Sequence, residues 1–168
     1  MCSTNTIHFE LPGFEVLRVD EGNELLVIQA QSMVPEAICP DCEQISGRVH
    51  SYYTREPRDL PSSGRKVRLV LSVRRFRCQN PHCERQTFAE RISPMVPVHG
   101  QRTNRLTAAL HALAFELSAE AGARVSQKLN MAVSGDTLLR VLRQTPTASA
   151  PFVHVLGIDD WAFKKGRE

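Results

Sequence analysis

Long apolar runs are absent from this sequence of 168 residues, and so is a basic N-terminal segment. No stretch of 18 apolar residues occurs, which argues against a transmembrane helix. The first thirty positions hold five acidic residues instead of a basic region followed by an apolar block, which argues against a secretory signal. The sequence is 42% hydrophobic, enough to fold as one modest domain or two small ones. We therefore expect a folded cytoplasmic protein without membrane contact, whose thiols stay reduced.

Basic residues are scarce near the N-terminus and frequent afterwards. Residues 1–47 contain one arginine against eight acidic residues, whereas residues 48–91 contain eleven lysines and arginines against four acidic residues. Residues 101–145 add six basic residues against three acidic ones. The formal net charge of +3 hides this segregation. A solvated surface of mixed sign would not normally be segregated in this way, so we expect a polyanion to face the middle and later segments.

Cysteine is also scarce, but four of the five cysteines form two close pairs. The pairs are "CPDC" at 39–42 and "CQNPHC" at 78–83. Two such pairs, separated by a few dozen residues, are typical of a zinc ribbon, in which two tight knuckles supply four thiolates to one tetrahedral Zn²⁺. The prolines in both loops favour the turns that this requires. We predict a structural zinc site with these ligands: Cys39, Cys42, Cys78 and Cys83.

Other interpretations of the cysteines stay open at this point. They include two buried disulfides, four unrelated core cysteines and a redox CxxC motif, although a reducing compartment and the second pair argue against all three. His82 or His50 could replace one thiolate as a ligand. A site with four protein ligands leaves no position for water or substrate, so we expect its role to be structural.

The segment between the knuckles has the period of a half-buried strand. Val67, Leu69, Leu71 and Val73 alternate with Arg68, Val70, Ser72 and Arg74. We expect a small antiparallel sheet with the metal at one end, preceded by a hairpin in "FEVLRVDEGNELLVIQAQ" whose glycine has positive φ. Arginines near the second knuckle are predicted to contact DNA phosphates, although a solvated strand face is the alternative. They are Arg74, Arg75, Arg77 and Arg85.

After a linker marked by proline and glycine, the pattern becomes helical. Residues 103–117 carry leucines at spacings of three and four, and two further helices are predicted to begin after Ser118 and Ser134. The short connection "LNMAV" before the third helix favours a helix-turn-helix, although a plain three-helix bundle shows the same stripes. The residues of the third helix predicted to contact DNA are Ser134, Asp136, Thr137, Arg140 and Arg143.

The order of these features resembles a known family. The motifs "CPDC", "VHSYY", "RRFRC", "TFAERI" and "GIDDWAFKKG" together resemble bacterial insertion-sequence transposases of the ISL-three type, from about residue 10 to the last residue. The resemblance implies an N-terminal zinc finger, a helix-turn-helix and a catalytic domain of the RNase H-like DDE kind. It also implies double-stranded DNA with the element's terminal repeats as the partner, with a homodimer or a mixed oligomer with full-length transposase left open.

The last stretch carries the catalytic expectation. In this family three carboxylates hold Mg²⁺ ions for attack on phosphodiesters, and Asp159 matches the first of them. A strand end with two solvated acids, Asp159 and Asp160, is the alternative. The sequence continues for eight residues beyond Asp160 and does not contain the second Asp and the Glu. We therefore expect a truncated transposase that is not an enzyme on its own, with Mg²⁺ needed only in a full-length member.

Together these expectations describe an α+β protein. Residues 1–93 are predicted to form the hairpin and zinc-ribbon domain, 94–102 a linker, 103–145 the helix-turn-helix domain and 146–168 the start of a DDE domain. The predicted function is binding of terminal inverted repeats by the DNA-binding portion of a transposase, in the cytoplasm at the nucleoid. A zinc-stabilised protein-interaction module and a free-standing DNA-binding regulator are the alternatives, and an active nuclease would need carboxylates from another chain.

Overall fold

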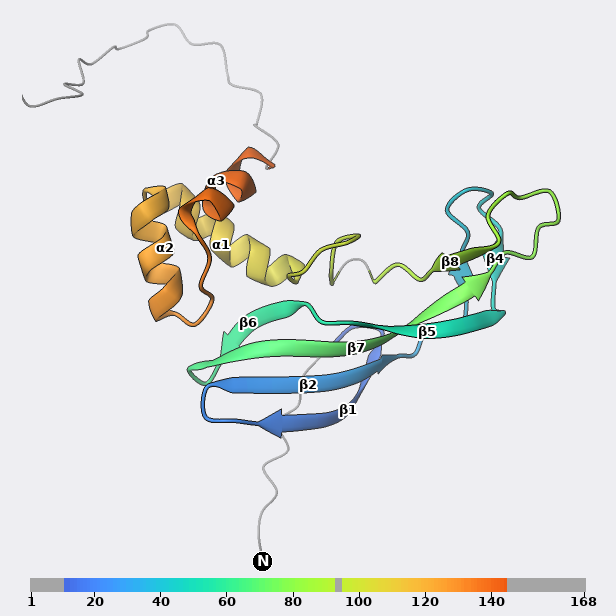
Figure 1. Cartoon of the computed structure of the whole chain (residues 1–168), viewed down its shortest axis with the longest axis horizontal. Helices are drawn as coiled ribbons and strands as arrows, with labels where there is room; N and C mark the ends of the chain where they lie inside the picture. Colours follow the sequence, from blue (N-terminus) through green and yellow to red (C-terminus); the bar gives the residue numbers. More distant parts are fainter. Residues whose placement is uncertain (1–10, 93–94, 145–168) are drawn as a thin grey trace, which may run out of the picture.

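The computed structural model describes residues 11–92 and 95–144, and Figure 1 shows how their elements are arranged. The predicted α+β class is confirmed, because strands come first and helices follow. The expected start of an RNase H-like domain, residues 146–168, lies outside the described residues. The elements are β1 (Phe14–Glu21), β2 (Leu25–Ser32), β3 (Ala37–Ile38), β4 (Ile45–Ser46), β5 (Val49–Arg55), β6 (Arg58–Ser62), β7 (Arg65–Arg77), β8 (Thr87–Ala89), α1 (Asn104–Glu116), α2 (Ala119–Lys128) and α3 (Gly135–Arg143).

The predicted N-terminal hairpin is present as β1 and β2, which pair antiparallel. One detail of the prediction is wrong: Gly22, in the turn, does not have positive φ. Its amide instead donates to the carbonyl of Leu25 at 2.9 Å, and this bond closes the turn. Among the described glycines, positive φ occurs at Gly13 (+78°) and at Gly64 (+70°), which lies in the turn between β6 and β7.

The large sheet is mixed rather than antiparallel, which corrects the sequence-based expectation. Its order is β1-β2-β7-β5, and β6 and β8 also pair with β7. β2 and β7 are parallel, with Leu25 opposite Lys66 and Gln31 opposite Ser72. Parallel neighbours need a long crossover, and residues 33–64 provide one. The N-terminal hairpin therefore joins the sheet through backbone hydrogen bonds instead of packing against a separate ribbon.

The alternation predicted along β7 is confirmed, and the strand contributes to two hydrophobic clusters on opposite faces. Val67, Leu69, Leu71 and Val73 are buried in the main core, together with residues of β2. Phe76 has the other parity and is buried against Phe88 and the cysteines. The cluster formed by Phe76, Phe88 and the cysteines therefore lies on the opposite face of β7 from the main core.

Three helices follow at the predicted positions. Their N-caps are Thr103, Ser118 and Ser134, and each side chain accepts a hydrogen bond from the backbone amide three residues later. A hydroxyl in this position satisfies an amide that has no partner within the helix, which is why these residues start helices. Their core consists of Leu106, Leu110, Ala114 and Leu138. In the part of the chain that the structure describes, no helix is long and apolar enough to cross a bilayer.

A buried carboxylate connects the helices to the sheet. Asp59 on β6 accepts hydrogen bonds from Thr103 Oγ1 and from Arg105 Nε, both at 2.7 Å, and from the Leu60 amide at 2.8 Å. Burial alone would raise the pKa of Asp59, but these bonds and the charge of Arg105 outweigh it and hold the pKa below its ordinary value. The helices are accordingly placed over the β6 end of the sheet, away from the β4 and β8 end (Figure 1).

Replacing Asp59 with asparagine is expected to lower the free energy of unfolding at pH 7 by about 2 kcal/mol, because its hydrogen bonds lose their charge assistance. The pKa of Asp59 is depressed in the folded state, so its stabilisation is present above about pH 4 and is lost as the pH falls through the folded-state pKa. Urea denaturation at several pH values measures both effects. The difference in the free energy of unfolding between the variant and the unmodified protein should become smaller in acid.

Asp20→Asn is the matched control, because Asp20 pairs with the exposed Arg18 at the sheet edge. Surface pairs of this kind contribute little, so the control should change stability by less than about 1 kcal/mol. Equal losses in the two variants would contradict the role given to Asp59.

Candidate metal centre and basic surface

Two short hairpins supply the four cysteines. The first knuckle lies between β3 and β4, and the second between β7 and β8. In each knuckle the amide of the first cysteine donates across the loop, from Cys39 to the Gln44 carbonyl and from Cys78 to the Gln86 carbonyl, both at 2.9 Å. Glu43 takes positive φ (59°), which lets the first loop close within a few residues. Both knuckles therefore turn their sulfur atoms toward a common point.

The sulfur geometry fits a tetrahedral zinc ion. The four Sγ atoms all lie within 4.8 Å of one another. Cys39 Sγ lies 3.9 Å from Cys83 Sγ, and Cys42 Sγ lies 3.5 Å from Cys78 Sγ. A tetrahedron with zinc–sulfur bonds of about 2.3 Å places its sulfur atoms about 3.8 Å apart, which matches these separations. All four cysteines are free rather than paired in disulfides, and a metal site requires free cysteines.

Neither histidine considered as a replacement ligand belongs to this cluster. The backbone of His82 is fixed by a bond from its amide to Asn80 Oδ1 at 3.0 Å, and its side chain is exposed. His50 is exposed on β5, where its ring Nδ1 lies 3.0 Å from Ser51 Oγ. The four-cysteine ligand set is therefore the one that the described residues support.

The thiols perturb one another strongly. The backbone of Gln44 hydrogen-bonds to the Cys42 sulfur and lowers its pKa to about 7. At Cys83 the Arg85 backbone bond lowers the pKa, but burial and the neighbouring thiols outweigh it and raise the pKa to about 12. Sulfur atoms this close cannot all carry a negative charge without compensation. A bound divalent cation would supply that compensation and let all four ionise together.

The side of the cysteine cluster that faces the protein interior is buried, which suits a structural site. Cys39 is fully buried, and Phe76 and Phe88 stack beneath the knuckles with ring centroids 6.1 Å apart. Arg85 Nε of the second knuckle pairs with Asp41 Oδ2 of the first at 2.7 Å. This ion pair raises the pKa of Arg85 and joins the two loops across the cysteines. With four sulfur ligands, no position remains for a substrate.

Two knuckles on β-hairpins that bring four thiolates together define a zinc-ribbon type of protein module. In the comparison with known families, residues 35–83 match the zinc-finger of transposase IS204/IS1001/IS1096/IS1165. The match spans all four cysteines, so this part of the chain resembles the zinc finger of ISL-three-type transposases, as the sequence motifs implied. No catalytic domain is identified by the family comparison. Searches among curated proteins and among solved structures found no match.

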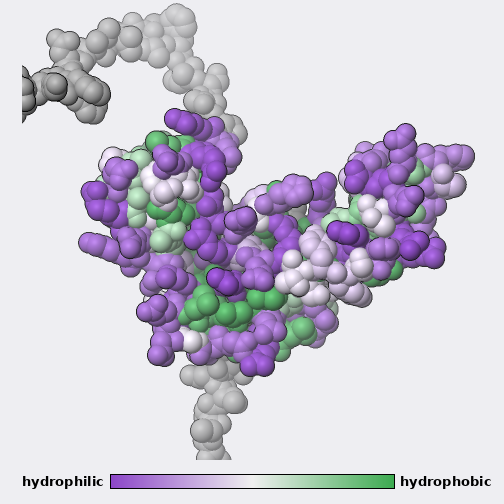
Figure 2. All heavy atoms as spheres, viewed as in Figure 1, coloured by the Kyte–Doolittle hydropathy of each residue, from purple (hydrophilic) through white to green (hydrophobic). Residues whose placement is uncertain are grey.

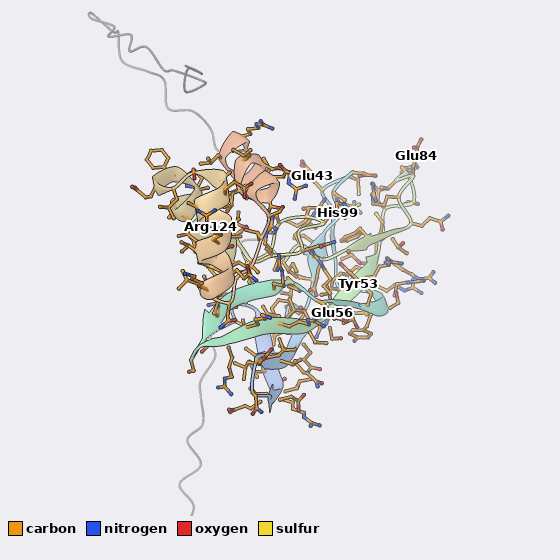
Figure 3. The ribbon with its side chains drawn as sticks, turned by 60° about the vertical axis from the view of Figure 1, so that its left-hand side comes forward. Glu43, Tyr53, Glu56, Glu84, His99 and Arg124 are labelled. Carbon is orange, nitrogen blue, oxygen red and sulfur yellow. The ribbon has the colours of Figure 1, made fainter. Side chains whose placement is uncertain are left out.

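Two of the predicted phosphate-binding arginines line a cavity of about 510 Å³ beside the knuckles. Arg75 lies over the Tyr53 ring, 5.7 Å from its centroid, and Arg85 faces the cavity from the second knuckle. Arg55 and Arg91 also line it and were not predicted. Figure 3 labels Tyr53 on β5 and His99 in the segment before α1, which are part of the lining. Only the folded sheet brings these separate segments together.

Arg74 is placed differently from the other predicted arginines. Its Nη1 donates to the Val34 carbonyl at 2.6 Å, and its Nε is buried without a partner. Arg75 and Arg77 are exposed, and strand alternation places them on the face opposite Arg74. Arg74 therefore holds the segment after β2 against the sheet, and Arg75 and Arg77 are the better candidates for phosphate contact.

The predicted residues of the third helix lie on or near its exposed side. Asp136, Arg140 and Arg143 are exposed, whereas Ser134 Oγ caps the helix by accepting from the Thr137 amide at 3.3 Å. The Ser134 and Thr137 hydroxyls also lie 3.1 Å apart. DNA contact by these five residues stays a prediction. Asp159 lies outside the described residues.

Hydrophilic side chains cover most of the face seen in Figure 2, with an apolar patch over the strands between the helices and the knuckles.

The protein is expected to bind one Zn²⁺ per chain, and Cys78→Ser is expected to abolish that stoichiometry. Native mass spectrometry measures the ion, and hydrogen exchange measures its structural effect. Chelation should first expose the amides of residues 37–46 and 78–89, because their core contains little besides two phenylalanines and the cysteines. The centre of β2 and β7 should stay protected, since a separate cluster covers it.

Cys2, the fifth cysteine, belongs to neither pair, so Cys2→Ser is the control and should leave the zinc content unchanged. Full zinc binding by Cys78→Ser, or knuckle amides that stay protected after chelation, would contradict the four-cysteine site.

Proposed function

We propose that residues 11–144 are the DNA-binding module of an insertion-sequence transposase, with the terminal repeats of the element as the bound DNA. The single observation that carries this proposal is the transposase zinc-finger match over residues 35–83, which coincides with a four-cysteine cluster of suitable geometry. In the proposal a structural Zn²⁺ holds the two knuckles together. The module works at the nucleoid, where the element's DNA is found.

The zinc finger supplies phosphate contacts rather than chemistry. Arg75 and Arg77 lie at the end of β7, directly before the second knuckle, and both side chains are exposed. A zinc ion bound by the four cysteines would hold that knuckle and, through it, the end of the strand. Guanidinium groups bind phosphate oxygens through paired hydrogen bonds, so these side chains position the protein on the duplex without reading its sequence.

In this proposal the helices recognise the sequence of the DNA. α2 and α3 are joined by residues 129–134 and both contact α1, and this supports the proposal of a helix-turn-helix. In this proposal α3 enters the major groove, so Asp136 near its start meets base edges and Arg143 near its end meets the backbone. Both side chains are exposed.

No reaction is assigned to residues 11–144. In the family, catalysis uses Mg²⁺ held by three carboxylates, of which Asp159 would be the first. The proposal therefore concerns recognition of DNA alone, and cutting and joining would depend on carboxylates beyond this module.

One observation favours a second function, binding of a partner protein. Ile38 and Ile45 pair across β3 and β4, and they are 60% and 57% exposed. Large apolar side chains that lie side by side on a surface commonly mark a protein contact. The same zinc finger would then stabilise an interaction surface.

The zinc-loaded protein is expected to bind duplex DNA from the ends of its element, with an affinity that falls steeply between 50 and 200 mM salt. Replacing Arg75 and Arg77 together with glutamine should reduce the slope of log affinity against log salt by about 2, because two phosphate contacts are lost. Fluorescence anisotropy with labelled duplexes measures the slope. Binding that ignores salt, or a double variant with the slope unchanged, would count against the proposal.

Replacing Ile38 and Ile45 together with serine separates the two functions. If the module works by binding DNA, this variant should retain the affinity and the salt slope, because neither side chain carries charge. Circular dichroism and zinc content provide the folding control. Loss of DNA binding in a folded, zinc-loaded variant would show that the apolar pair belongs to the binding surface.

A further inference from the structure

Three arginines from separate elements lie in the region where the helices contact the sheet. Arg58 lies on β6, Arg102 in the segment before α1, and Arg140 on α3. The backbones of the first two are connected, since the Arg58 amide donates to the Gln101 carbonyl at 2.9 Å and the Thr103 amide donates to the Arg58 carbonyl at 3.0 Å. We call Arg58, Arg102 and Arg140 the arginine seam.

The charges within the seam are not compensated. Burial lowers the pKa of Arg102, and the positive charges of Arg58 and Arg140 lower it further, so two like charges lie close enough to act on Arg102. Within residues 11–92 and 95–144, no carboxylate forms an ion pair with any of the three. Arg58 Nη1 instead donates to the Ala132 carbonyl at 3.0 Å.

Nearby arginines show that carboxylates are within reach of this region but are used elsewhere. Arg105, three residues after Arg102, pairs with Asp59. Arg65 at the start of β7 pairs with Glu21, with Nη1 and Oε2 2.9 Å apart. The fold therefore pairs these neighbouring guanidinium groups with carboxylates and leaves those of the seam without a carboxylate partner. Such an arrangement costs folding free energy unless an anion occupies it.

We propose that the arginine seam binds a backbone phosphate of duplex DNA, beside the groove that α3 enters. Guanidinium groups match the geometry of phosphate oxygens, and a phosphate would neutralise the mutual repulsion. This inference rests on the proposed function and adds a specific contact to it. Because Arg140 belongs to α3 while Arg58 belongs to the sheet, one phosphate held by both fixes the orientation of the helix relative to the zinc-finger part.

The first experiment measures thermal stability in low-salt buffer with and without inorganic phosphate. Without phosphate, Arg102→Gln should melt at the same temperature as the unmodified protein or higher, because a like charge has been removed. Phosphate at about ten times its dissociation constant should raise the Tm of the unmodified protein by about 3 °C and leave that of Arg102→Gln unchanged. A purely structural arginine would give the opposite sign, with the variant melting lower and phosphate making no difference.

The second experiment measures binding of duplex DNA at several salt concentrations. Arg102→Gln and Arg140→Gln should each reduce the slope of log affinity against log salt by about 1. Arg140 is exposed, so its variant keeps the test valid if Arg102→Gln fails to fold. Arg18→Gln is the matched control, because it removes one positive charge from β1, where Arg18 pairs with Asp20, and it should leave the slope unchanged.

The outcomes separate this inference from the proposed function. Salt slopes of both seam variants equal to that of the control would overturn the seam as a DNA contact, while DNA binding by the unmodified protein would still support the module. Failure of the zinc-loaded protein to bind DNA would overturn the proposed function, and a phosphate shift that depends on Arg102 would then support the seam as a phosphate site alone. If phosphate raised the Tm of all variants equally, the seam would be overturned as a phosphate site as well.

Discussion

The structure depends on the pairing of β7 with its neighbours. This strand of 13 residues hydrogen-bonds to β2, β5, β6 and β8, so four strands take their positions from it. Its apolar residues change face between Val73 and Phe76, which lets one strand contribute to the main core and to the core of the metal site. The exposed Arg75 and Arg77 flank Phe76, so the same alternation that buries the aromatic ring presents two positive charges.

A second connection sets the helices on the sheet. Asp59 is buried and receives hydrogen bonds from the helix cap Thr103 and from Arg105 on α1. Asn130, in the turn before α3, adds a bond from Nδ2 to the Gly64 carbonyl at 2.8 Å. These contacts bring α1 and the turn after α2 against the β6 and β7 end of the sheet. The basic surface near the knuckles and the exposed side of α3 consequently belong to one framework.

Local signals could be predicted from the sequence, and contacts between distant segments could not. The paired cysteines, the alternation along β7 and the caps Ser118 and Ser134 each depend on residues a few positions apart. The parallel pairing of β2 with β7 depends on the path of residues 33–64, which strand periodicity does not encode. The bond from Arg74 to the Val34 carbonyl spans 40 positions, so a pattern that shows an arginine on the outer face of a strand cannot reveal it.

The change of face along β7 also constrains how the length of this protein can vary in evolution. A single residue inserted between Val73 and Phe76 would turn either the aromatic ring or the aliphatic residues to the wrong side, and the sheet could not absorb this by local adjustment. The neighbouring strand already accommodates one extra residue, because the pairing of β5 with β7 shifts between Val49 and Ser51. Insertions and deletions among related sequences should therefore concentrate in β5 and in the loops, and the spacing from Val73 to Cys78 should stay constant.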